Sequence, residues 1–143
     1  MRAKLPTFEA WFEAQNFKHF QADEFTSYFN RYRGKVKNSP PPRALWENII
    51  RTLWVLDDLR RYYNRPIVIL SSYRSPAYNT AVGGESKSLH MKFNAIDFAV
   101  AGHSPPAVAR KLKEWRTNGK FSGGIGLYPT FVHLDTRGYN ATW

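Results

Sequence analysis

The chain has 143 residues, with 21 Lys and Arg against 11 Asp and Glu, so its formal net charge is +10. Its length suits one domain, and a hydrophobic content of 43% is too high for an intrinsically disordered chain. There is no cysteine, which excludes disulfides, thiolate metal sites and a thiol nucleophile. Any transition-metal site must therefore use histidine and carboxylate side chains.

The charge and the hydropathy of the sequence indicate which partners the protein could have and where it could act. No apolar run approaches the ~18 residues of a transmembrane helix, and the basic N-terminal start lacks the apolar core of a signal peptide. A pI near 10 indicates attraction to polyanions such as nucleic acid, anionic lipid or an acidic cell wall. Basic residues are densest in 31–37, with a second group in 110–113. A solvated face with a basic loop is favoured over a specific nucleic-acid surface, because no nucleic-acid motif is present.

The elements of the N-terminal half follow from aromatic, proline and apolar spacing. Residues 8–15 and 23–29 are short, aromatic-rich amphipathic pieces. Consecutive prolines in 34–42 predict an extended connector, because proline cannot sit inside a helix. In 43–63, apolar side chains recur at steps of three and four, which predicts the strongest helix of the chain.

In the C-terminal half, strands and helices alternate. The β-branched run at 66–70 and the segment 95–100 predict strands, as do 124–128 and 130–136 around a turn at Pro129. Ser75 and Ser104 each precede a proline, which predicts two helix starts. The pattern predicts an α+β domain in which helices pack on one face of a small antiparallel sheet. We expect residues 1–42, an aromatic and basic segment with its connector, to form one compact unit with the domain 43–143.

Two of the four histidines lie near carboxylates on predicted strands. Side chains alternate faces along a strand, so Asp97 points away from the core side chains on either side of it. By the same rule, His133 and Asp135 share one face. If the two strands are neighbours, these three side chains converge, and His90 on the preceding loop reaches over them.

This pattern allows two interpretations. Two histidines and one carboxylate are the ligand set of a catalytic zinc that keeps one position for water, whose pKa falls to ~7. A histidine beside a carboxylate is also common as a hydrogen-bonded structural pair. His-x6-Asp spacing alone does not choose between them.

Several ordered motifs carry a family resemblance. They are 71–79 (SSYRSPAYN), 82–84 (VGG), 88–97 (SLHMKFNAID), 123–129 (GGIGLYP) and 131–135 (FVHLD). The sequence resembles the zinc D-alanyl-D-alanine carboxypeptidase group, which includes phage endolysins and the hedgehog signalling domain. Within that group it is similar to the murein endopeptidase branch, whose chains end near a tryptophan, as Trp143 does here. The resemblance covers residues 43–143 and implies the hedgehog/D-Ala-D-Ala peptidase fold.

The resemblance implies roles for five residues. His90, Asp97 and His133 match the ligands of one zinc ion per chain. Arg74 matches an arginine that binds substrate and stabilises the developing oxyanion, a task suited to a permanently charged guanidinium with several donors. Its alternative is a structural salt bridge at the strand end. Ser88 matches a position that orients a ligand or the substrate, or that makes only a loop hydrogen bond.

One position departs from the family pattern. Many members carry a carboxylate, the general base, three residues before the last histidine ligand, and here that position is Thr130. Asp135 is the nearest substitute. It acts as the catalytic base, holds a ligand imidazole, or is merely structural. Glu85, on the glycine-rich loop, is a more distant candidate for the base.

The resemblance therefore predicts a zinc metallopeptidase of murein endopeptidase or D,D-/L,D-carboxypeptidase type. It would hydrolyse an amide bond next to a D-amino acid in the peptidoglycan stem peptide or cross-link. The alternative is a catalytically weak or inactive, zinc-containing wall-binding module of the same fold, which Thr130 favours. We expect a monomer with peptidoglycan as partner and no nucleic acid. If a leader was removed, we expect the protein in the cell envelope. Otherwise, we expect it to be released as a phage lysin is.

Overall fold

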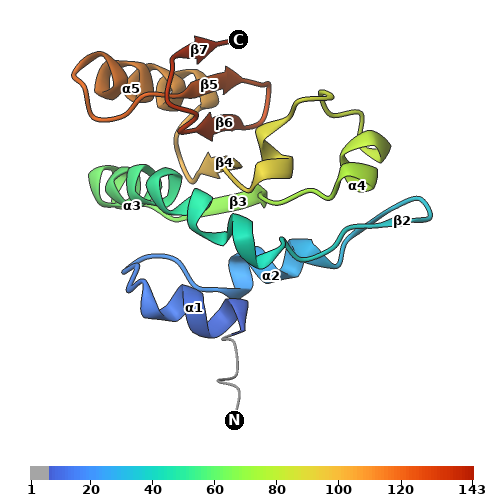
Figure 1. Cartoon of the computed structure of the whole chain (residues 1–143). Helices are drawn as coiled ribbons and strands as arrows, with labels where there is room; N and C mark the ends of the chain where they lie inside the picture. The colour runs from blue at the N-terminus through green and yellow to red at the C-terminus, as the bar shows by residue number, and fades with distance from the viewer. Residues whose placement is uncertain (1–6) are drawn as a thin grey trace.

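A computed structural model describes residues 7–143, and the N-terminal start at 1–6, where no signal peptide is expected, lies outside the described residues. Figure 1 shows the chain, in which η denotes a 3-10 helix. The elements are α1 (Phe8–Ala14), α2 (Asp23–Phe29), β1 (Tyr32–Arg33), β2 (Val36–Lys37), η1 (Arg43–Ile49), α3 (Ile50–Tyr63), β3 (Ile67–Ser71), α4 (Pro76–Ala81), η2 (Leu89–Lys92), β4 (Ala95–Val100), α5 (Pro105–Thr117), β5 (Gly124–Leu127), β6 (Val132–Asp135) and β7 (Ala141–Thr142).

The main sheet has the strand order β3-β4-β6-β5-β7. Its pairs are antiparallel except for β7, which the sequence did not predict and which runs parallel to β5. Helix α5 packs against β4, β5 and β6, and the apolar side chains of β4 and β6 lie in the core. The expected α+β fold with a small antiparallel sheet is confirmed.

Two helix starts form as the serine-proline pairs predict. The Ser75 hydroxyl accepts a hydrogen bond from the Tyr78 amide (3.2 Å), and the Ser104 hydroxyl accepts one from the Ala107 amide (3.4 Å). Each satisfies an amide that the first helical turn leaves without a partner. Because Ser75 follows Arg74 directly, the first of these caps fixes the chain next to a candidate site residue.

The predicted helix at 43–63 is divided in the structure. Residues Arg43–Ile49 form the 3-10 helix η1, and the α-helix α3 begins at Ile50. In a 3-10 helix, side chains three residues apart align, and Trp46 and Ile49 are both buried. The Trp46 indole also donates to the Pro41 carbonyl at 2.9 Å, which ties η1 to the proline segment.

The extended connector predicted at 34–42 is wrong in its first part. Strands β1 and β2 form an antiparallel hairpin that includes residues 34–37. Gly34 adopts a φ of +60°, which allows the chain to reverse between Arg33 and Val36. Proline spacing indicated the irregular segment at 38–42, but a hairpin with two residues per strand is too short for a period-two pattern.

The N-terminal segment packs against the region that carries the candidate site. The ring of Phe8 lies 5.2 Å from that of Phe29, 5.4 Å from that of Trp46 and 5.9 Å from that of Phe93, centroid to centroid. Phe93 is fully buried and ends η2, the short helix on which His90 lies. Helices α1 and α2 therefore pack against the end of η2, the element that carries His90. That segments 1–42 and 43–143 fold as one unit stays a prediction.

Within residues 7–143, no helix combines the length and the apolar character needed to cross a bilayer.

Candidate active site

Strand pairing places three of the predicted site residues together. Asp97 of β4 lies opposite His133 of β6 in the antiparallel register. Nδ1 of His133 is 3.0 Å from Oδ1 of Asp97, and its Nε2 is 2.8 Å from Oδ2 of Asp135. The expectation that the two strands are neighbours, with these side chains on one face, is confirmed.

His90 reaches the same point from η2. The Ser88 hydroxyl accepts a hydrogen bond from the His90 amide (3.2 Å) and so fixes the start of this short helix. Nδ1 of His90 lies 2.6 Å from the Ser72 carbonyl oxygen, which can only accept a hydrogen bond. Nε2 of His90 lies 3.1 Å from Oδ2 of Asp97, yet it is buried and has no hydrogen-bond partner.

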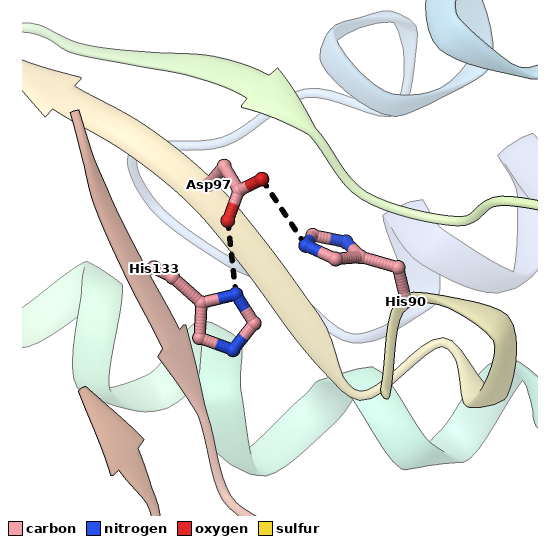
Figure 2. Close-up of side chains that lie close together, drawn as sticks. All are labelled: His90, Asp97 and His133. Carbon is pink, nitrogen blue, oxygen red and sulfur yellow. Dashed lines mark hydrogen bonds and ion pairs between the residues drawn. The ribbon is translucent and has the colours of Figure 1, made fainter. Parts of the chain in front are cut away.

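These contacts fix the tautomer of one imidazole. His90 must carry its proton on Nδ1 to donate to the Ser72 carbonyl, so its Nε2 keeps a lone pair that faces the Asp97 carboxylate. Both nitrogens of His133 lie against carboxylates, Nε2 against Asp135 and Nδ1 against Asp97; Figure 2 shows the contacts of both histidines with Asp97. A proton kept on Nε2 of His133 would leave the lone pair of Nδ1 available to a metal ion. One ligand atom from each residue lies within 4.8 Å of the others.

The donor set fits a divalent metal. Two imidazole nitrogens and a carboxylate oxygen suit zinc, and both imidazoles have the outer hydrogen bonds that orient metal-bound histidines. The unpartnered Nε2 of His90 supports this interpretation, since a buried nitrogen without a partner is costly in a purely structural cluster.

Burial and the contacts within the cluster set the charges of its members. Burial lowers the pKa of His90, which keeps its ring neutral. Burial raises the pKa of Asp97, but its close contacts with His90 and His133 outweigh that effect and hold the pKa below its usual range. Burial lowers the pKa of His133, yet hydrogen bonds to Asp135 and Asp97 raise the pKa overall. The two carboxylates that flank the His133 ring therefore favour its protonated form, and a metal ion would replace the proton on Nδ1.

Asp135 is fully buried and its carboxylate has no free acceptor position. Oδ1 accepts from the Gly124 amide (2.9 Å) and from the Arg137 amide (3.2 Å) and Nε (2.9 Å). Oδ2 accepts from Nη2 of Arg137 and from Nε2 of His133, both at 2.8 Å. Burial raises the pKa of Asp135, but these hydrogen bonds outweigh it and hold the pKa below its usual range. Asp135 had three candidate roles: catalytic base, hydrogen-bond partner of a ligand imidazole, or structural residue. This geometry favours the second role, in which Asp135 holds the His133 ring.

Glycines allow this close packing around Asp135 and His133. A Cβ on Gly124 would lie 2.4 Å from Oδ2 of Asp135, so a side chain there would displace the carboxylate. A Cβ on Gly126 would lie 2.6 Å from Nε1 of Trp143, whose ring packs 4.9 Å from that of His133. Two of the three glycines of the 123–129 motif, Gly124 and Gly126, are thus explained by these contacts.

Arg74 lies beside the cluster. Its guanidinium donates to Oγ of Ser71 (3.3 Å), Oδ1 of Asn79 (3.2 Å) and Oδ2 of Asp97 (3.3 Å). These bonds leave one N–H free on each terminal nitrogen of the guanidinium. Arg74 therefore forms the salt bridge that was the alternative to a substrate-binding role, and it still has donors available for another ligand.

A cleft of about 810 Å³ opens over the cluster. Arg74, Ser88, Glu85 and the three candidate ligands line it, together with Tyr128, Phe131, Arg137 and Trp143. Tyr128 stacks on Phe131 at 4.6 Å and accepts a hydrogen bond from the Trp143 indole (2.9 Å), which forms an aromatic wall. Thr130 lines a separate small cavity against α5 instead.

Sequence reasoning missed two partners in this site. Arg137 follows Asp135 by two residues, so strand alternation could have placed it on the same face. Ser72 contributes through its main-chain carbonyl, and such a contact cannot be predicted from a pattern of side chains.

Comparison with known proteins agrees with this site. The sequence model of the peptidase M15 family matches residues 18–135, which include the whole cluster. The chain belongs to the peptidase M15 family.

A relative in Haemophilus influenzae extends the comparison. It is named probable peptidoglycan L,D-endopeptidase MepK, and this chain is 36% identical to it over 87 residues. The match covers 56% of this chain and 44% of the relative, so the chain spans less than half the length of that protein.

Proposed function

We propose that this protein is a zinc-dependent peptidoglycan peptidase that acts in the cell envelope as a monomer with one zinc ion per chain. The observation that carries the proposal is the convergence of His90, Asp97 and His133, with one ligand atom of each within 4.8 Å of the others and Nε2 of His90 buried without a hydrogen-bond partner. The name of the relative supports an amide bond between an L- and a D-residue of the stem peptide or cross-link as the substrate.

Each residue of the site has a task in this proposal. His90, Asp97 and His133 would hold the zinc ion, which supplies Lewis-acid chemistry by lowering the pKa of water to ~7 and polarising a carbonyl. Arg74 places its free N–H donors in the cleft, where they can hydrogen-bond the oxygen of the scissile amide as negative charge develops. Ser88 orients His90 through the amide that it caps.

The general base, which accepts a proton from water, is best provided by a side chain that is exposed in the cleft. Among the described residues lining the cleft, the acidic side chains are Asp97, a candidate ligand, and the exposed Glu85. Asp135 does not line the cleft, and its oxygens are already occupied. We therefore assign proton transfer to Glu85 and the positioning of His133 to Asp135.

The alternative function is a wall-binding module with weak or no turnover. It is favoured by Thr130, which replaces the carboxylate expected for the family and lies outside the cleft. In that case the metal cluster would be structural, and the cleft would hold the stem peptide without cleaving it.

Digestion of purified peptidoglycan tests the proposal. The protein is incubated with added zinc, with a chelator, and as the His90→Ala variant, and released muropeptides are identified by mass spectrometry. We expect products only from the zinc-loaded native chain, with fragment masses that identify the scissile bond. Peptidoglycan that is bound but not cleaved in the presence of zinc would instead establish the binding module.

A further inference from the structure

The hairpin β1–β2 carries a concentrated positive charge that the proposed catalytic function does not use. Within residues 31–37 (RYRGKVK), four of the seven residues are cationic and none is acidic. All four are exposed: Arg31, Arg33, Lys35 and Lys37. We call these residues the basic hairpin.

The cations of the basic hairpin have no paired carboxylate among the described residues. Some cations elsewhere do pair with carboxylates, as Lys111 does with Glu114 at 2.9 Å. Among residues 7–143, no ion pair includes a cation of the basic hairpin. The Arg31 guanidinium lies 4.0 Å from the centroid of the Tyr28 ring, which orients the charge without cancelling it. The hairpin therefore offers its full charge to a partner.

The basic hairpin is fixed next to the cleft. At its base, the buried Asn38 side chain donates to the carbonyls of Tyr28 and Tyr73, both at 2.9 Å, and accepts from the Ser75 amide at 2.8 Å. Tyr73 and Ser75 are the two neighbours of Arg74, which lines the cleft. Figure 1 shows the hairpin projecting beside α4, which packs against both of its strands.

We propose that the basic hairpin binds free carboxylates of peptidoglycan stem peptides adjacent to the one held in the cleft. This inference rests on the proposed function for its choice of partner. Peptidoglycan is a glycan polymer that carries stem peptides at close spacing, and the free carboxylates of these peptides match the cations of the hairpin. Because the hairpin is attached to the chain on both sides of Arg74, it would bind a polymer that also enters the cleft.

A charge-neutralised variant with a matched control tests this inference. The full chain carries either Arg33→Gln with Lys35→Gln, or Arg110→Gln with Lys113→Gln on the exposed face of α5. Both double variants remove two positive charges, so net charge alone cannot separate them. Binding to purified sacculi is measured by co-sedimentation at low and at about 0.15 M salt, with a chelator present so that no cleavage is needed.

We expect the hairpin variant to bind sacculi roughly tenfold or more weakly at low salt, and the α5 variant to change by less than about twofold. Amidation of the sacculus carboxylates should remove the difference between the native chain and the hairpin variant. Thermal unfolding of each variant checks that it is folded.

Three results would overturn the inference. One is equal binding by the two double variants, and another is a hairpin effect that persists on amidated sacculi. The third is loss of duplex DNA binding by the hairpin variant while sacculus binding is retained, which would assign the hairpin to nucleic acid. Absence of cleavage by the zinc-loaded native chain, with binding that depends on the hairpin, would contradict the proposed function alone.

Discussion

Replacing Asp135 with asparagine separates a positioning role from a catalytic one. The substitution keeps the side-chain volume but leaves one oxygen where two oxygens accept five hydrogen bonds. The new NH₂ group must face either the Gly124 amide or the donors of His133 and Arg137. If it faces Nε2 of His133, the imidazole moves its proton to Nδ1 and loses the lone pair directed at the metal site.

The magnitude follows from the loss of one outer hydrogen bond to a metal-binding histidine. Such changes typically weaken metal binding by about 10- to 100-fold, which corresponds to about 1.4–2.7 kcal/mol. We expect a rise of this size in the zinc dissociation constant of Asp135→Asn, measured by titration against a competing chelator dye. At saturating zinc, its kcat should return to within about tenfold of the native value.

Glu85→Gln is the matched control for the catalytic role. If Glu85 accepts the proton, its zinc affinity stays native while kcat falls by about 10²- to 10⁴-fold. Unchanged zinc affinity in Asp135→Asn would refute the positioning argument. If kcat of that variant also stayed low at saturating zinc while Glu85→Gln remained active, Asp135 would be the base.

Further predictions address the remaining residues of the site. His90→Ala and His133→Ala should each reduce bound zinc well below one per chain, and full occupancy measured by atomic absorption would contradict the ligand set. Arg74→Ala should retain zinc but lower kcat/KM by about 10²- to 10³-fold on a muropeptide substrate, and native kinetics would exclude its role in charge stabilisation. Gly126→Ala should displace the Trp143 ring, because the new Cβ would lie 2.6 Å from Nε1. The quantum yield and the emission maximum of tryptophan fluorescence should change while the protein stays folded. An identical spectrum would show that the ring accommodates the methyl group.

The sequence by itself predicted the candidate ligands, through the family resemblance, and most of the sheet. Alternation along a strand is a property of the extended backbone, so it placed His133 and Asp135 on one face of their strand, and Asp97 away from its core neighbours, without knowledge of the rest of the chain. That the two strands pair, which brings Asp97 to the other two, came from the tertiary structure. Serine followed by proline likewise identified two helix starts, because both residues act through their own backbone geometry and the next turn.

Only the tertiary structure decided what each of these side chains does. The proton position on His90 depends on a carbonyl at Ser72, 18 residues earlier in the chain, and main-chain acceptors have no sequence signature. Asp135 looked free to act as a base until its contacts with Arg137 and the Gly124 amide were known. The basic hairpin was visible as composition, but its place beside Arg74 depends on the buried Asn38. Local periodicity determines which face of its strand or helix a residue occupies. Contacts between distant segments determine its protonation, its partners, and the hydrogen-bond donors and acceptors that it has left.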